Sequence, residues 1–295
     1  MEIIPIGPGF GAEIRGVTIQ DVSNDDSVYK DVRAAFEEHS VLVFRGQHID
    51  NDSQLAFSRQ FGEPEVTKVG SLGTGTHFIT LTTIGPDGKI VPSDHRYALR
   101  NKANQLWHTD SSFKPVPALT SILSARIVPD HGGETEFVSM RLAFERLDPA
   151  RQKQFEKAWV WHDYNHSRSK IAPGLPSAEE RAALPPVCHR MVWTNPVNGR
   201  SALYLASHAC AIEGMESEAA LKLIDELTAA ATAPAVTYAH KWKNGDVVMW
   251  DNRATMHRGR PWPADEPRLM VRTTISAGKA DGVDQMQPPP REAAE

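Results

Sequence analysis

Short apolar runs, separated by polar and turn-forming residues, dominate the pattern along this chain of 295 residues. Runs of this kind, rich in β-branched and aromatic residues, are typical of β-strands. We expect strands at residues 2–6, 12–19, 40–47, 119–128, 134–140, 159–164, 191–196, 201–206, 235–242, 246–252 and 269–276. The pair Asn198-Gly199, between two of these runs, predicts a tight hairpin turn.

Three segments instead show the spacing of an amphipathic helix. Residues 25–39 begin with aspartates and place apolar side chains four residues apart. The other two are residues 51–62, with Gly62 as the expected C-cap, and residues 216–232. Many short strands, few helices and no alternating strand–helix pattern predict a mostly β fold with flanking helices. The expected architecture is a double-stranded β-helix, or jelly-roll barrel.

The regular pattern is lost between residues 64 and 104, where glycine and proline are frequent. Long irregular segments inside compact domains are often lids or binding loops. Because no linker is evident, we predict a single jelly-roll domain at residues 1–280, with helical insertions and a lid segment at 64–104. Residues 281–295 are rich in proline and charge, which predicts a disordered tail.

Composition narrows the class of protein. The net charge is −5 and no long basic run is present, which argues against a nucleic-acid partner. No apolar stretch approaches the roughly 18–20 residues that cross a bilayer, and the N-terminus lacks the features of a signal peptide. The two cysteines, Cys188 and Cys210, do not indicate a disulfide scaffold. We expect a soluble cytoplasmic protein; a homo-oligomer stays open.

The stretch NQLWHTDSSF at residues 104–113 places His108 and Asp110 two positions apart. In a strand, such residues project from the same face and could be half of a metal site. They could equally be polar positions of a surface strand, or Asp110 could cap a turn. His257 lies on what we predict to be a loop after a strand, and Arg268 opens a further strand eleven residues later.

Two histidines and one carboxylate form the facial triad of non-haem Fe(II), which leaves three coordination positions open. A 2-oxo acid can fill two of them, and dioxygen the third. The far carboxylate of such a cosubstrate needs a bidentate cation, for which arginine suits better than lysine. Arg268 is the candidate, and the hydroxyl of Thr135 would complete the clamp.

A rival cluster is the string HDYNH at residues 162–166. On a helix, His162 and His166 could bind zinc, but the glutamate of the HExxH signature is absent. The preceding residues are strand-like, which would keep the two histidines apart. We interpret both as pocket-wall or surface residues.

Several motifs occur together in one order: SVLVFRGQ, LAFSRQFG, NQLWHTDSSF, VPDHGGETEF, ASHACAIEGM, GDVVMWDNRATMHRGR and a later RTT. In these motifs the chain resembles, from about residue 11 to 276, the Fe(II)/2-oxoglutarate dioxygenases of the taurine dioxygenase superfamily. Within it, the resemblance is strongest to the 2,4-dichlorophenoxyacetate (aryloxyalkanoate) dioxygenases. It implies His108, Asp110 and His257 as iron ligands, with Fe(II), 2-oxoglutarate as cosubstrate, and O2.

The resemblance also implies residues that bind the organic acids. Thr135 and Arg268 would hold the C5 carboxylate of 2-oxoglutarate, and Arg272 the acidic group of the substrate. Lys68 would meet the substrate carboxylate, and His208 would line the pocket. For each of the last three residues an ordinary structural role stays open: an ion pair for Arg272, an exposed lysine for Lys68 and a buried histidine for His208.

The chain departs from the family on the substrate side. Residues 80–83 read Thr-Leu-Thr-Thr where the relatives have an Asp-Ile-Ser-Asn-like string, and Thr83 is our candidate substrate contact there. Phe78, Phe113 and Tyr204 are candidates for the pocket wall. Both the iron and the 2-oxoglutarate motifs are retained, so the reaction class is better defined than the substrate.

The expected reaction is hydroxylation of the carbon alpha to the ether oxygen of an aryloxyalkanoate such as 2,4-dichlorophenoxyacetate. The products would be a phenol, glyoxylate or another 2-oxo acid, succinate and CO2. One alternative keeps the chemistry but uses taurine or another alkyl sulfonate or sulfate. Another is a cupin-like isomerase or hydrolase that binds a metal without 2-oxoglutarate. A non-catalytic binding protein would not bring the three ligands together.

Overall fold

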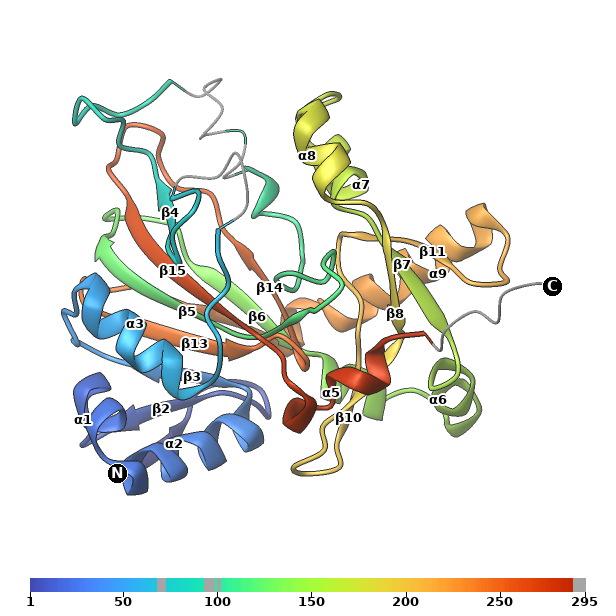
Figure 1. Ribbon diagram of the computed structural model, residues 1–295, viewed down its shortest axis with the longest axis horizontal. Coiled ribbons are helices and arrows are strands. Elements are labelled where there is room, and N and C mark those ends of the chain that lie inside the picture. Colours follow the sequence, from blue (N-terminus) through green and yellow to red (C-terminus); the bar gives the residue numbers. More distant parts are fainter. Residues whose placement is uncertain (68–72, 93–98, 100–101, 289–295) are drawn as a thin grey trace.

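A computed structural model describes residues 1–67, 73–92, 99 and 102–288 (Figure 1). Within these residues the fold is mixed α/β, and the strands form four sheets. The largest sheet has seven strands, in the order β1 (Glu2–Pro5), β2 (Ala12–Arg15), β3 (Val41–Phe44), β13 (Val247–Asp251), β5 (Ala118–Ile127), β15 (Leu269–Ser276) and β4 (Ile79–Thr82). Its neighbouring strands are antiparallel except for β2 and β3.

A three-stranded sheet packs on one face of this large sheet. Its strands are β12 (Thr237–His240), β6 (Thr135–Ser139) and β14 (Thr255–Gly259). Along β13, successive side chains point to opposite faces. Val248 and Trp250 join an apolar cluster with Phe137 of β6, whereas Val247 and Met249 join the cluster on the other face. The apolar layer between the two sheets therefore fixes β6 and β14 relative to the centre of the large sheet.

Three helices pack on the opposite face of the large sheet (Figure 1): α1 (Ile19–Asn24), α2 (Asp26–His39) and α3 (Asn51–Gln60). Phe36 of α2 and Phe57 of α3 are fully buried against Val247 and Met249. This burial of one apolar stripe per helix is what stabilises helices of this length in water.

A second group of strands and helices lies on the side of the molecule away from α1 to α3, at the right of Figure 1. Its strands are β7 (Trp159–His162), β8 (Val187–Arg190) and β11 (Ala209–Ile212) in one sheet, and β9 (Val192–Thr194) and β10 (Ser201–Leu203) in another. Its helices are α5 (Met140–Glu145), α6 (Pro149–Phe155), α7 (Tyr164–Ser169), α8 (Ala178–Ala183) and α9 (Ser217–Ala231). A separate apolar cluster, which includes Phe155, Val160 and Leu227, holds this group together. The described residues also form three 3-10 helices, η1 (Pro234–Val236), η2 (Lys279–Asp281) and η3 (Val283–Met286).

The helices predicted at 25–39, 51–62 and 216–232 are confirmed as α2, α3 and α9. The expectation of few helices is wrong, because the described residues form five more short helices, α1 and α5 to α8. The prediction of a single strand at residues 12–19 is wrong. β2 ends at Arg15, and α1 begins at the capping box formed by Thr18 and Asp21.

Two predicted segments are described only in part. Residues 68–72, 93–98, 100 and 101 of the expected lid lie outside the described residues. Within the rest of it, β4 forms the edge of the large sheet and pairs with β15. Of the expected disordered tail, residues 281–288 are described, and Val283 and Met286 are buried in the core, so disorder is wrong for this part. None of the helices in the described ranges is both long and apolar enough to span a lipid bilayer.

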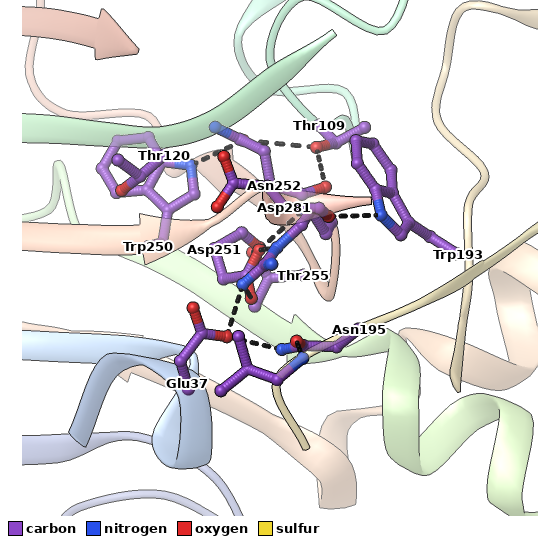
Figure 2. Close-up of polar contacts among 12 residues, drawn as sticks. Glu37, Thr109, Thr120, Trp193, Asn195, Trp250, Asp251, Asn252, Thr255 and Asp281 are labelled. Atoms are coloured by element: carbon purple, nitrogen blue, oxygen red, sulfur yellow. Dashed lines mark hydrogen bonds and ion pairs between the residues drawn. The ribbon is translucent and has the colours of Figure 1, made fainter. Parts of the chain in front are cut away.

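A buried cluster of charges ties α2 to the end of β13 (Figure 2). The Arg253 guanidinium donates to both oxygens of Asp251, at 2.9 Å each, and to Glu37 Oε2 at 2.7 Å. The Asn195 amide also donates to Glu37 Oε2, at 2.5 Å. Burial raises the pKa of Glu37, but the Arg253 charge and the Asn195 amide outweigh it and hold the pKa below its usual value. Glu37 is therefore an ionised carboxylate that links three segments distant in sequence.

Replacing Glu37 with alanine is expected to lower the free energy of unfolding by about 3–5 kcal/mol, because Arg253 would stay buried with part of its compensation removed. Urea denaturation followed by circular dichroism measures this quantity. Glu38→Ala is the matched control, since that side chain is 62% exposed and lies 3.7 Å from Arg200, and its loss should cost about 0–1 kcal/mol. Equal destabilisation by both substitutions would contradict a structural role of the buried cluster.

Candidate metal centre and active site

The first two ligands of the centre face each other across a single pair of backbone hydrogen bonds. The His108 N–H donates to the His257 carbonyl at 3.0 Å, and the His257 N–H donates to the His108 carbonyl at 2.8 Å. His257 lies on β14, so the prediction of a loop there is wrong. Of the two conformations left open for His108 and Asp110, the strand does not form and the turn does: His108 makes one isolated bridge, and a turn follows in which Ser111 has a φ of 55°.

Asp110 completes the set from this turn. Its Oδ1 lies 3.9 Å from His108 Nε2, and its Oδ2 lies 3.6 Å from His257 Nε2. All three residues are buried, and their ligand atoms lie within 4.8 Å of one another. In the part of the chain that the structure describes, this is the one cluster of three or more His, Cys, Asp or Glu residues close enough to hold a metal ion.

The protonation states suit a divalent cation. Burial lowers the pKa of His108 and holds that of His257 well below its usual value, so both imidazoles are neutral. His108 Nδ1 lies 2.7 Å from the Leu106 carbonyl and donates to it, which leaves the Nε2 lone pair for a metal. Burial raises the pKa of Asp110, but the charge of Arg272 and the hydrogen bond from the Ser121 hydroxyl lower it, and the net shift keeps the carboxylate ionised. Two neutral imidazoles and one carboxylate are the donor set of non-haem Fe(II), so these residues fit the metal.

One cavity beside the triad is lined by Thr135, Trp250, His257, Arg268 and other residues. Arg268 is 6% exposed, and its Nη2 donates to the Gly133 carbonyl at 3.3 Å. Its Nε is buried without a hydrogen-bond partner among the described residues, and burial lowers its pKa to about 10. At neutral pH this guanidinium is a buried cation with a free donor. It can bind a carboxylate that enters the cavity.

A second cavity is lined by His108 and Asp110. Its lining includes Glu65, Phe113, Arg168, His208 and Arg272. Arg272 lines both cavities, and its Nη1 donates to Asp110 Oδ1 at 2.7 Å. The ion pair that the sequence left open for Arg272 is therefore present, with the ligand carboxylate as its partner.

The remaining predicted site residues occupy different positions. Thr83 accepts a hydrogen bond from the Arg268 backbone N–H at 3.1 Å and does not line either cavity beside the triad. Lys68 lies outside the described residues. Phe113 lines the second cavity, whereas Tyr204 is buried in the core against Trp193.

The rival histidine pair separates. His162 ends β7 and is fully buried against His189 and Tyr204. Asp163 caps the next helix, so His166 lies on α7 and not on a continued strand. Neither this helix nor Arg168, which lies one turn along α7 and lines the second cavity, was predicted from the sequence. Asp163, a residue type favoured at the N-cap, was the signal in the sequence that could have indicated this helix.

Comparison with known proteins agrees with this geometry. Residues 2–274 match the family described as taurine catabolism dioxygenase TauD, TfdA family. An alpha-ketoglutarate-dependent 2,4-dichlorophenoxyacetate dioxygenase of Burkholderia sp. (strain RASC) is 37% identical over 272 residues, covering 90% of this chain and 91% of the relative. An (S)-phenoxypropionate/alpha-ketoglutarate-dioxygenase of Sphingobium herbicidovorans is 32% identical over 287 residues, or 95% of this chain and 96% of the relative.

A solved structure is also similar. The crystal structure of AAD-2 in complex with Mn(II) and N-oxalylglycine has a TM-score of 0.86 at 37% identity, and the match covers 94% of this chain and 98% of that one. The isomerase, hydrolase and non-catalytic alternatives are therefore wrong. The chain belongs to the TauD, TfdA family of dioxygenases and is a 2-oxoglutarate-dependent non-haem iron enzyme with the triad His108, Asp110 and His257.

Proposed function

We propose that this enzyme hydroxylates the carbon alpha to the ether oxygen of an aryloxyalkanoate such as 2,4-dichlorophenoxyacetate. The observation that best supports this proposal is the second cavity. There an aromatic wall, formed by Phe113 and His208, and the Arg168 cation lie beside the iron ligands His108 and Asp110. Phe113 and His208 line this cavity with their ring centroids 4.8 Å apart, and the buried Tyr164 contacts Phe113 at a centroid distance of 4.9 Å. The Arg168 guanidinium lies 4.6 Å from the centroid of the Tyr164 ring. An aryl ring and a carboxylate match these two features, and the named relatives support the same substrate class.

When bound, Fe(II) and 2-oxoglutarate supply the oxidation: one oxygen atom of O2 enters the substrate C–H bond, and the other enters succinate as CO2 is released. His108, Asp110 and His257 hold the metal. Arg268 holds the C5 carboxylate of 2-oxoglutarate through its free donor, with the Thr135 hydroxyl beside it. The hydroxylated carbon is a hemiacetal, and it collapses when the carbon–aryl oxygen bond breaks and the hydroxyl proton moves to the phenol.

Within this proposal, Arg168 takes the carboxylate of the substrate. Arg272 lines both cavities and donates to Asp110 Oδ1 at 2.7 Å. Its main role is therefore to neutralise and orient the Asp110 carboxylate. His208 forms part of the aromatic wall. Thr83 positions Arg268 by accepting a hydrogen bond from its backbone N–H. A contact between Lys68 and the substrate carboxylate stays a prediction.

The wider predictions of the sequence are retained in the proposal. We place the two packed sheets in a double-stranded β-helix within a single domain, residues 1–280, with a lid in the segment 64–104. The enzyme would work in the cytoplasm, as a monomer or homo-oligomer. The taurine and alkyl sulfate alternative uses the same iron and 2-oxoglutarate residues, and it is an outcome of the first test.

The first test is a substrate panel with iron-loaded enzyme, 2-oxoglutarate and O2, in which succinate and phenol are both quantified. Release of phenol in equal amount to succinate is expected with 2,4-dichlorophenoxyacetate or a phenoxypropionate, and no release with His108→Ala. Succinate formation stimulated by taurine or an alkyl sulfate, without any turnover of aryl ethers, would overturn the proposed substrate and keep the reaction class.

Arg268→Leu tests the cosubstrate site. A hydrogen bond to a charged group contributes about 1.5–3 kcal/mol, so the KM for 2-oxoglutarate should rise about 10–150-fold. Arg268→Lys keeps the charge but loses the planar fork, and should give an intermediate KM. Arg260→Leu, at a side chain that is 50% exposed, is the control. An unchanged KM in Arg268→Leu would show that the cosubstrate carboxylate binds elsewhere.

Arg168→Met tests the substrate site. Because Arg168 is half-buried, its contribution should be about 1–2 kcal/mol, which corresponds to an increase in KM for the aryloxyacetate of about 5–30-fold. The KM for 2-oxoglutarate, and turnover of a neutral aryloxyacetamide, should not change. Arg181→Met, at an exposed position on α8, is the matched control. The assignment fails if the acid and the amide lose the same activity.

A further inference from the structure

A chain of hydrogen bonds runs from the side chain of Asn252 to the iron-binding carboxylate. Asn252 directly follows β13, is 1% exposed and lies between Trp250 and Thr109 in Figure 2. Its Nδ2 donates to Ser121 Oγ at 3.1 Å, and Ser121 Oγ donates to Asp110 Oδ2 at 2.7 Å. All of these groups are buried, where an incomplete polar network would be costly.

The orientation of the Asn252 amide is fixed by its donors. Its Oδ1 accepts from Trp250 Nε1 at 3.0 Å, from the Asp110 backbone N–H at 3.1 Å and from Thr109 Oγ1 at 3.2 Å. The first two of these groups can only donate, so the atom facing them must be the oxygen. The nitrogen consequently faces Ser121 and must donate, and the Ser121 hydroxyl is free to direct its own proton toward Asp110.

Asn252 therefore acts on Asp110 at two points. It fixes the backbone of the turn through the Asp110 N–H, and it fixes the carboxylate through Ser121. Arg272 Nη1 donates to the other carboxylate oxygen, Oδ1, at 2.7 Å. A carboxylate has about four lone-pair sites, so with one taken on each oxygen the remaining sites are left for the metal.

We propose that Ser121 and Asn252 are positioning residues for iron: they hold the Asp110 carboxylate in its metal-binding orientation before the metal arrives. Neither residue lines the two cavities beside the triad, so neither contacts substrate or cosubstrate. Partners of this kind commonly change metal affinity about 10–100-fold when they are replaced. The inference concerns metal binding and does not depend on the proposed substrate.

Titration of the metal-free protein with Co(II) tests the proposal without turnover. The Trp250 and His257 ring centroids are 4.5 Å apart, so quenching of tryptophan fluorescence reports occupancy. Ser121→Ala is expected to raise the Kd for Co(II) about 10–100-fold. Ser121→Thr, which retains a hydroxyl, should bind Co(II) as the unsubstituted protein does.

Ser124→Ala is the matched control. Ser124 is also buried on β5, but its hydroxyl donates to Gln54 Oε1 at 2.7 Å, away from the triad. Both alanine variants should lower the thermal stability of the metal-free protein, and only Ser121→Ala should weaken Co(II) binding. Equal Co(II) affinity in the two variants would overturn the proposal and leave Ser121 with a purely structural role.

Asn252→Asp tests the hydrogen bond from Asn252 to Ser121. The variant keeps the size of the side chain and an oxygen for Trp250 and Asp110, but it presents an acceptor to Ser121. The single Ser121 proton would then be shared between two carboxylates, and Co(II) affinity should fall as in Ser121→Ala. Unchanged affinity in Asn252→Asp would overturn the part assigned to Asn252. This variant also carries the test if Ser121→Ala fails to fold.

Discussion

The backbone pairing of His108 with His257 is the contact on which the centre depends. These two residues exchange both of their backbone hydrogen bonds, so their side chains emerge on the same side of the pair, with ring centroids 4.2 Å apart. The segment that carries His108 has little regular structure of its own. Its position is therefore set by β14, and β14 is held in turn by β6 and the apolar layer behind it.

Charge compensation at Asp110 is the second requirement. Burial alone would raise the pKa of this carboxylate and favour its neutral form, which is a poor ligand for a divalent cation. Arg272 supplies the largest opposing effect, and the Ser121 hydroxyl adds a hydrogen bond to the ionised form. The buried triad and Arg272 together carry no net charge, so this charged ligand can persist in the interior without its metal.

The sequence predicted the parts of this arrangement that depend on local pattern. Long amphipathic helices and apolar strands are visible as periodicity, whereas α5 to α8 have seven residues or fewer, too few to show it. The three ligands were identified from residue type, order and resemblance, but their backbone conformations were not, because pairing with a distant strand decides them. The hydrogen bond from Asn252 to Ser121 spans 131 positions, and no local signal reports such a contact.

Strand register explains how Ser121 and Arg272 come to contact different oxygens of the Asp110 carboxylate. β5 and β15 are antiparallel neighbours, with Ser121 opposite Thr274 and Leu123 opposite Arg272. Residues two apart on a strand share a face, so Ser121 and Arg272 project from the same face of the sheet at a fixed separation. A slip of one residue would turn β15 over and remove Arg272 from the carboxylate. The apolar residues on both faces of this sheet oppose that slip, and in this way the core of the protein sets the orientation of an iron ligand.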